Sequence, residues 1–354
     1  MVTAALDSRG CAVYHETKMR KAMLWEPIGD GRVRCMLCAH RCLIADGKRG
    51  ICMVRENRGG VLYTHVYGRI VSQAFDPIEK KPLFHFLPGA PALSIATVGC
   101  NFRCEFCQNY EISQYPREHD GAVLGEHIEP EEVVAQAKAA GAPIIAYTYT
   151  EPTVFFETAY DTARLAAREG IKNVFVSNGY LTREAAEEIA PFLHGINIDL
   201  KSFSDDFYRR HCGASLQPVL DTIERMVGLG VWVEVTTLVI PGWNDSGEEL
   251  SWLAEFLRGV SPDIPWHISR FIPAYRVFDR PPTPLSTLRR AREIGLAAGL
   301  KYVYLGNVPG EGEDTRCPSC GETLIRRHGF YVLENRLVDG RCPSCGEAIP
   351  GVWS

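Results

Sequence analysis

Three cysteines with metal-ligand spacing lie within eight residues of this chain. Cys100, Cys104 and Cys107 form a C-x3-C-x2-C pattern directly after the short apolar run Leu93–Thr97. Three thiolates on one tight loop suit three corners of a cubic iron–sulfur cluster. Because a fourth cysteine is missing, one iron would stay open to bind a substrate or a cofactor. The alternative is half of a zinc site, since C-x2-C pairs are common in such sites.

Most of the remaining cysteines are also grouped. The chain has 13 cysteines in 354 residues. Eight more of them form two tight sets, Cys35/Cys38/Cys42/Cys52 and Cys317/Cys320/Cys342/Cys345. Clustered C-x2-C spacing without a secretory signal favours metal binding over disulfides. Cys11 and Cys212 belong to no set, and we interpret both as free thiols.

The C-terminal cysteine set has the spacing of a zinc ribbon. Cys317–Cys320 and Cys342–Cys345 enclose 21 residues, and each pair is followed by a glycine, Gly321 or Gly346, that permits a tight turn. Four thiolates close a structural zinc site, although a rubredoxin-like iron has the same ligands. The basic run 326–328 in this unit is expected to be a solvent-exposed strand end.

The N-terminal set, Cys35, Cys38, Cys42 and Cys52, also offers four thiols. Glycines between Cys42 and Cys52 allow the chain to fold back, and His40 could replace one thiol. We expect zinc here in preference to an auxiliary iron–sulfur cluster, which stays open as the alternative.

Strand-like and helix-like segments alternate between residues 92 and 306. The apolar runs are 93–98, 144–149, 173–177, 196–200, 232–240, 266–271 and 301–305, and the helical stretches are 130–140, 154–168, 183–193, 218–229, 248–257 and 284–298. This alternation predicts βαβ units and a parallel sheet. Six or seven repeats in about 215 residues are too few for a closed eight-fold barrel. We therefore predict an α/β fold with a partial (β/α)6 TIM-like barrel, with a doubly wound sheet as the alternative.

The rest of the chain flanks this barrel. The predicted domains are a cysteine-rich N-terminal extension over 1–90, the barrel over 91–308 and a zinc-ribbon-like unit over 309–354. The net charge of −5 gives no bulk electrostatic case for a nucleic-acid partner. The start lacks an apolar signal core, and no apolar run would span a membrane. We expect a cytoplasmic protein.

Polar residues follow the predicted strands at their carboxyl ends, where parallel α/β barrels carry their chemistry. They are Thr150-Glu151-Pro152, Ser177-Asn178-Gly179, Asp199-Leu200-Lys201, Ile240 to Asn244, and His267 with Arg270. Each alone is as well explained by a helix cap or a turn. Their convergence on one rim, together with the cysteine loop, favours a catalytic site.

Longer strings resemble the radical S-adenosylmethionine (SAM) superfamily, and within it the relatives of the pyruvate formate-lyase activating enzyme. The chain looks most like the radical SAM member of the AmmeMemoRadiSam system. The strings are Cys100 to Ser113, Ala146 to Thr153, Val176 to Gly179, Asn197 to Ser202 and Trp266 to Pro273. The resemblance implies the barrel fold and, bound by Cys100, Cys104 and Cys107, a [4Fe–4S] cluster.

The resemblance also implies roles for the rim residues. Glu151 would lie near the SAM amino group, although Tyr-Thr-Glu-Pro replaces the usual Gly-Gly-Glu. The implied SAM-binding residues are Phe106, Glu151, Ser177, Asn178, Asp199, Lys201, Ile240 and Asn244. The candidate catalytic residues are His267, Arg270 and Lys201. Strand alternation puts residues 267 and 270 on opposite faces, so both reach the cavity only if the strand twists or bulges.

The function implied is reductive cleavage of SAM to a 5′-deoxyadenosyl radical, which abstracts hydrogen from an unidentified substrate. The electron donor would be a reduced flavodoxin or ferredoxin, and Memo-like and AMMECR-like proteins are possible partners. One alternative is an activase that installs a glycyl radical on a partner enzyme. Activases often carry cysteine repeats after the cluster loop, which this chain lacks. A zinc-dependent scaffold without activity is the non-enzymatic alternative.

Overall fold

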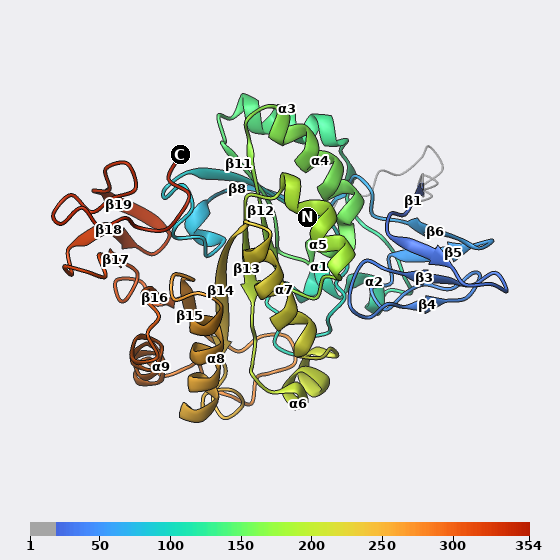
Figure 1. The fold of residues 1–354 in the computed structure, drawn as a ribbon. Helices are drawn as coiled ribbons and strands as arrows, with labels where there is room; N and C mark the ends of the chain where they lie inside the picture. The colour runs from blue at the N-terminus through green and yellow to red at the C-terminus, as the bar shows by residue number, and fades with distance from the viewer. Residues whose placement is uncertain (1–18) are drawn as a thin grey trace, which may run out of the picture.

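The computed structural model describes residues 19–354. Cys11, expected to be a free thiol, lies outside these residues. The molecule has a central α/β unit, an N-terminal β-lobe at one end and a C-terminal three-stranded unit at the opposite end (Figure 1). None of the helices formed by residues 19–354 combines the length and the apolar character needed to cross a membrane.

The central sheet has eight strands in the order β16-β15-β14-β13-β12-β11-β9-β8. Their bounds are β8 Ser72–Pro77, β9 Pro91–Ala96, β11 Ile144–Tyr147, β12 Lys172–Ser177, β13 Gly195–Asp199, β14 Trp232–Val239, β15 Trp266–Arg270 and β16 Val303–Gly306. Strand β8 is antiparallel to β9, and the other neighbours are parallel. Every apolar run predicted as a strand is one of the seven parallel strands, because these strands are buried on both faces and therefore lack polar alternation.

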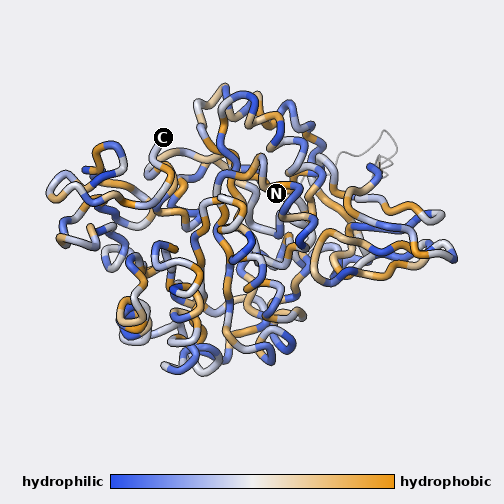
Figure 2. The backbone as a smooth tube through the Cα atoms, in the orientation of Figure 1, coloured by the Kyte–Doolittle hydropathy of each residue, from blue (hydrophilic) through white to orange (hydrophobic). Residues whose placement is uncertain are grey.

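Helices connect successive parallel strands, as the sequence predicts. They are α3 Pro130–Ala139, α4 Phe156–Arg168, α5 Arg183–Ile189, α7 Gln217–Gly228, α8 Gly247–Val260 and α9 Leu285–Ala297. The first turn of α3 is closed by a capping box between Glu129 and Glu132, and Thr182 and Ser246 cap α5 and α8. Figure 2 shows that the central strands run largely through hydrophobic residues, whereas the surrounding helices alternate in hydropathy.

Short segments complete the loops of the central unit. They are η1 Ile78–Lys80, α1 Tyr110–Ser113, α2 Tyr115–Glu118, β10 Glu126–His127, η2 Pro152–Phe155, η3 Ala190–Phe192, α6 Asp205–Phe207 and η4 Tyr208–Cys212. Strand β10 pairs with β7 (Arg69–Ile70).

The N-terminal lobe consists of two small antiparallel sheets. One has the order β1-β6-β5 and the other β2-β3-β4. The strands are β1 Arg20–Lys21, β2 Trp25–Pro27, β3 Val33–Cys35, β4 Leu43–Ile44, β5 Arg55–Arg58 and β6 Val61–Thr64. The lobe docks on the loop after β12. There Ala39 N donates to Tyr180 O at 2.9 Å, and Cys38 forms an isolated antiparallel β-bridge with Leu181. The lobe also contacts α4, where the buried side chains of Arg55 and Glu157 pair at 2.6 Å.

The C-terminal unit is the antiparallel sheet β17-β18-β19, formed by Thr315–Arg316, Thr323–His328 and Tyr331–Asn335. It packs on the central unit through a hydrophobic cluster that includes Phe84, Tyr304 and Leu324. The expectation that 326–328 is a solvent-exposed strand end is wrong at Arg327. Its side chain is fully buried and pairs with Glu79 at 3.4 Å.

Candidate functional site

One large cavity opens at the carboxyl ends of the parallel strands. Its volume is about 480 Å³, within the range of small-molecule sites. All three cysteines of the loop after β9 line it, namely Cys100, Cys104 and Cys107. Residues in or just after each strand from β8 to β16 also line it, from Lys80 to Asn307. All eight strands of the central sheet therefore contribute to the wall of the cavity.

Backbone geometry aims the cysteine loop into the cavity. Gly99 has a φ of +101°, and a Cβ there would lie 2.9 Å from the Val54 side chain. Only glycine fits such a close approach in the left-handed region. Behind the loop, the Cys100 sulfur accepts from Phe102 N at 3.4 Å, and the Cys107 sulfur contacts Ser113 Oγ at 3.3 Å. Polar donors to thiolate sulfurs are a common way to tune an iron–sulfur cluster.

The three thiols fit a metal cluster by their chemistry. Burial raises the pKa of the Cys100 thiol, and the nearby Glu151 and Cys104 raise it further. The thiolate form needed for metal binding is therefore unfavourable in the empty protein and would be stabilised by a bound cation. Three thiols that line one cavity with no fourth cysteine among them suit a cluster with one open iron.

Glu151 is the most densely bonded side chain at the rim. It is 2 % exposed, and Thr153 and Ser177 donate to its Oε1. The Asn178 backbone N donates to Oε2 at 2.8 Å. Burial raises the pKa of the Glu151 carboxyl, and the hydrogen bonds from Thr153, Asn178 and Ser177 oppose that rise. The carboxylate is thereby fixed in one orientation beside the cysteine loop.

Asn178 connects this carboxylate to the cysteine loop. Its Nδ2 donates to Asn101 Oδ1 at 2.7 Å and approaches the Cys100 sulfur at 3.8 Å. Gly179, the next residue, has a φ of +71°, and a Cβ there would lie 2.7 Å from the Ile198 side chain. The turn after β12 therefore needs glycine to hold Asn178 in place.

A partly buried cation lies near Cys104 of the cysteine loop. Lys201 Nζ contacts Asp199 Oδ2 at 2.9 Å and lies 5.9 Å from the Phe106 ring centroid. Burial would lower the pKa of Lys201, but Asp199 and the nearby Cys104 raise it well above its ordinary value. Lys201 is therefore positively charged.

Six of the predicted SAM-binding residues line the cavity together. They are Phe106, Glu151, Ser177, Asn178, Asp199 and Lys201. Ile240 and Asn244 do not line it. Asn244 Oδ1 instead accepts from Ile240 N, and its Nδ2 donates to Lys201 O, so Asn244 holds two backbone segments together beside the cavity.

The predicted catalytic residues His267 and Arg270 do not line the cavity. His267 is buried below it, with Nε2 2.6 Å from Glu234 Oε2. Arg270 donates from Nε to the Thr283 carbonyl at 3.0 Å. Ser269, between them on β15, lines the cavity instead. His267 points the same way as Ser269 but sits deeper along the strand.

Several cavity residues were not anticipated. Lys80 and Tyr149 line it, and both bond the buried Asp76: Lys80 Nζ at 2.8 Å, and Tyr149 through its hydroxyl. The lysine follows the antiparallel strand β8, which carries no strong strand pattern. Phe330 reaches the cavity from the β18–β19 turn of the C-terminal unit, a contact that depends on how separate units pack.

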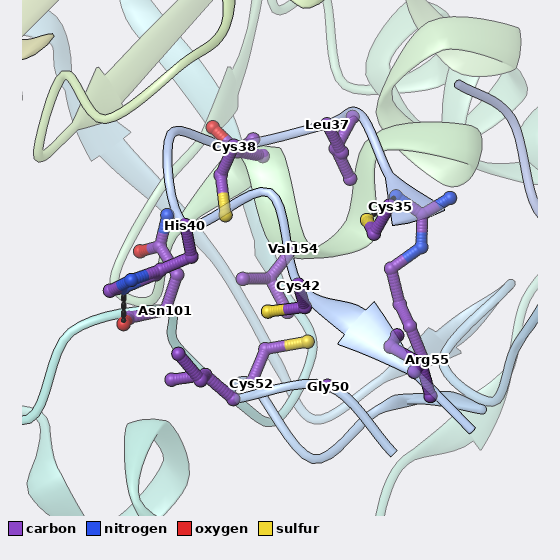
Figure 3. A pocket seen from close by; sticks show the side chains of 13 residues that line it. Cys35, Leu37, Cys38, His40, Cys42, Gly50, Cys52, Arg55, Asn101 and Val154 are labelled. Atoms are coloured by element: carbon purple, nitrogen blue, oxygen red, sulfur yellow. Dashed lines mark hydrogen bonds between the residues drawn. The ribbon is translucent and has the colours of Figure 1, made fainter. Parts of the chain in front are cut away.

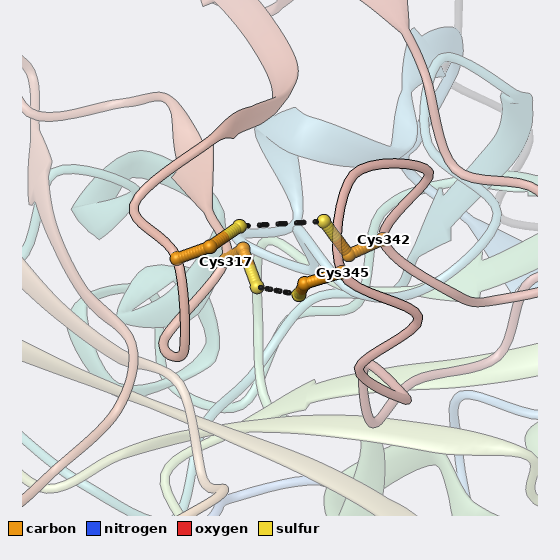
Figure 4. Close-up of side chains that lie close together, drawn as sticks. Cys317, Cys342 and Cys345 are labelled. Carbon is orange, nitrogen blue, oxygen red and sulfur yellow. Dashed lines mark hydrogen bonds between the residues drawn. The ribbon is translucent and has the colours of Figure 1, made fainter.

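The four C-terminal cysteines come close together. Their sulfur atoms all lie within 4.8 Å of one another. Cys317 and Cys345 are 3.5 Å apart, and Cys320 and Cys342 are 3.6 Å apart (Figure 4). Ligands about 2.3 Å from one zinc ion lie about 3.8 Å apart in a tetrahedron. Gly321 and Gly346 have φ values of +77° and +78°, as the predicted turns require.

The chain is similar in sequence to a known protein family and to several known proteins. The profile of the Radical SAM superfamily matches residues 94–256. The chain is 47 % identical over 314 residues to the uncharacterized protein MJ0808 of Methanocaldococcus jannaschii, covering 88 % of this chain and 92 % of that protein. It is 25 % identical to the putative glycyl-radical enzyme activating enzyme MJ1632 of the same organism, covering 61 % of this chain and 79 % of that one.

Among solved structures, Streptococcus suis SuiB bound to S-adenosylmethionine is similar with a TM-score of 0.48 and 15 % identity, covering 65 % of this chain and 53 % of SuiB. From the family profile and the extended similarity to MJ0808, the chain belongs to the radical SAM superfamily.

Proposed function

We propose that this protein is an enzyme that cleaves SAM reductively at a [4Fe–4S] cluster held by Cys100, Cys104 and Cys107. The observation that carries the proposal is the cavity that these cysteines share with Glu151, Asn178 and other polar rim residues. The cluster, when bound, would supply one electron and an open iron for SAM. In the superfamily this chemistry yields a 5′-deoxyadenosyl radical, which would here abstract hydrogen from a substrate still to be identified.

The chain's own residues would bind and orient SAM. The fixed Glu151 carboxylate is an acceptor suited to the SAM ammonium group, and Ser177 and Asn178 offer neighbouring polar groups. Lys201 and Asp199 would contact SAM near Cys104. The lining of one cavity by residues in or just after every strand of the central sheet supports a sheet curved into a partial barrel. His267 and Arg270 have no part in this proposal because neither lines the cavity.

The assignment to a subfamily and to partner proteins rests on short sequence segments. The segments Cys100 to Ser113 and Ala146 to Thr153 support membership in the AmmeMemoRadiSam system, with Memo-like and AMMECR-like partners. A reduced flavodoxin or ferredoxin would donate the electron, as superfamily members typically require. The close C-terminal sulfurs support a structural zinc ion in that unit.

A second candidate is a glycyl-radical enzyme activase. It is favoured by the similarity to MJ1632, a putative glycyl-radical enzyme activating enzyme. Under this proposal the hydrogen comes from a glycine of a partner protein. A stable glycyl radical, detected by electron paramagnetic resonance (EPR) on an added partner, would distinguish the two.

The ligand assignment is tested with paired cysteine variants. Cys104→Ala should lose the cluster that changes its EPR signal on SAM addition, because Cys104 supplies one of only three thiolates. Cys212 is a buried neighbour of Cys104 that does not line the cavity, so Cys212→Ala should keep both the cluster and the response. A SAM-responsive cluster that persists in Cys104→Ala would overturn the assignment.

A further inference from the structure

The N-terminal cysteines surround a second cavity, separate from the main one. Cys35 ends β3, Cys38 and Cys42 flank the turn before β4, and Cys52 lies in the turn before β5. All four line the same pocket, together with His40. Figure 3 shows their side chains arranged around one space. The chain therefore presents four thiols to one buried site.

The spacing of these thiols differs from that of the C-terminal set. In the part of the chain that the structure describes, the C-terminal cysteines form a group whose ligand atoms are close enough to share one ion, and the N-terminal cysteines do not. Thiolates that share one zinc must lie about 3.8 Å apart. In a cubane each thiolate binds a different iron, so the sulfurs lie farther apart with the cluster between them. The open arrangement round a pocket fits a cluster.

The pocket also holds an unpaired part of a buried cation. Arg55 lines it with a side chain only 2 % exposed. One terminal nitrogen contacts the Cys35 sulfur at 3.5 Å, and the other donates to Glu157 and the Met23 carbonyl, both at 2.6 Å. Its Nε has no hydrogen-bond partner among residues 19–354. A buried guanidinium beside four thiolates offsets the negative charge that an all-cysteine cluster carries.

Much of the remaining wall is apolar, with Asn101 and Thr153 as its polar members, and it adjoins the loop of Cys100. Leu37, Ile44, Ile51 and Val154 line the pocket and limit its contact with water, and such a shell controls the potential of a cluster. His40 Nε2 lies 2.9 Å from the carbonyl of Asn101, which belongs to the loop of Cys100.

A shared cation joins the two cysteine loops. Arg117 donates to the carbonyls of Ile51 at 3.0 Å and Cys100 at 3.4 Å. The N-terminal pocket and the main cavity are therefore neighbours, joined by these hydrogen bonds.

We propose that Cys35, Cys38, Cys42 and Cys52 hold a second [4Fe–4S] cluster, beside the SAM site, in place of the zinc ion favoured by spacing alone. This assignment rests on the N-terminal residues and is independent of whether the main cavity cleaves SAM.

The test removes the main site and leaves the N-terminal one untouched. The full-length variant Cys100→Ala/Cys104→Ala/Cys107→Ala is reconstituted anaerobically with iron and sulfide. A second cluster predicts about four irons per chain and, after reduction, an EPR signal of a [4Fe–4S] cluster that SAM does not change. A chain that binds zinc at this site, or no iron, overturns the proposal.

The metal content of the wild-type protein tests the proposal even if the triple variant misfolds. It should contain about eight irons and about one zinc, and Cys38→Ala/Cys42→Ala in the same chain should lose about half of the iron. About four irons with about two zincs in the wild type would contradict the second cluster. SAM cleavage is measured separately on the wild type, so failure of the proposed function is distinguished from failure of this site.

Discussion

At the scale of single residues, Glu151 is the clearest link between local structure and proposed chemistry. Its two carboxylate oxygens accept from Thr153, Ser177 and Asn178. A backbone N–H donates to each oxygen. The site therefore suits a carboxylate, because an amide side chain would place its own N–H₂ group against one of these donors. The rigid orientation follows from the backbone of η2 and the turn after β12.

Glu151→Gln should weaken SAM binding about tenfold or more. Glutamine lacks the negative charge that would pair with the SAM ammonium group, and a hydrogen bond to a charged group contributes about 1.5–3 kcal/mol. Iron content should be unchanged because Glu151 is not a proposed ligand. Equilibrium binding of SAM to the iron-loaded variant measures the effect.

Glu249→Gln is the matched control. Glu249 is also a buried carboxylate, and its Oε1 accepts from Ser202 and Phe203. An amide can keep these bonds on one oxygen, and the residue does not line the cavity. Equal loss of SAM affinity in both variants would show that Glu151 acts only through stability.

His85 provides a residue-scale test of pH dependence. It is buried where the C-terminal unit meets the sheet, with Nδ1 2.7 Å from Pro350 O and Nε2 2.7 Å from the Tyr304 hydroxyl. Burial lowers the pKa of His85 to about 4. The ionisable groups that face it are Glu234, which opposes this shift, and Arg327 and His267, which support it.

The stabilisation by neutral His85 should be lost in acid. The unfolded pKa is about 6.5, so the contribution is complete above about pH 6.5 and declines as the pH falls towards 4. Relative to His85→Gln, the free energy of unfolding of the wild type should fall by about 1 kcal/mol between about pH 7.5 and about pH 5.5. Denaturant titrations of both proteins at each pH measure it. A difference independent of pH would mean that His85 is not held neutral.

At the scale of elements, the seven parallel strands and the six long helices could be predicted because burial on both faces and helical periodicity are local signals. The burial of one residue in the basic run 326–328 could not be predicted. Arg327 belongs to a basic run, yet it is buried because Glu79, from the loop after β8, lies across the interface. That partner is about 250 residues away in sequence, and no local pattern reports it.

Arg327→Met should destabilise the docking of the C-terminal unit by about 3–5 kcal/mol, because it leaves Glu79 buried without its partner. Arg326→Met is the control: Arg326 is 56 % exposed and lies 3.7 Å from Glu334, so its loss should cost at most about 1 kcal/mol. Chemical denaturation of the metal-loaded proteins compares the two. Equal effects would contradict the buried pairing.

The turn after β12 tests how an element positions the site. Gly179→Ala should lower stability and SAM affinity, because the new Cβ meets Ile198 and displaces Asn178. Gly170 has a similar φ of +74° with nothing within 4 Å of a new Cβ. Gly170→Ala should therefore cost only the backbone strain, about 1 kcal/mol, and Gly179→Ala about 1–3 kcal/mol more. Thermal unfolding and SAM binding measure both, and equal costs would contradict the role of the close contact.

At the scale of the whole molecule, the C-terminal unit joins the two ends of the open sheet. Thr315 bonds the Tyr304 hydroxyl of β16 at 2.8 Å, and Arg327 reaches Glu79 after β8. The same unit brings Phe330 to the main cavity. The sequence predicts a separate small unit but not its place, because docking depends on contacts between distant segments. Five of the predicted SAM-binding residues that line the cavity follow from the convergence of strand ends in a parallel sheet, namely Glu151, Ser177, Asn178, Asp199 and Lys201. Phe106 is expected there only through the family resemblance.

The measurement that tests the central claim most directly is SAM cleavage by the whole protein. Iron-loaded wild type is incubated anaerobically with SAM and dithionite, and 5′-deoxyadenosine and methionine are quantified. The account predicts that both form in equal amounts and that neither forms with Cys104→Ala. A wild type that carries its full iron, binds SAM and releases no 5′-deoxyadenosine under these conditions would contradict it.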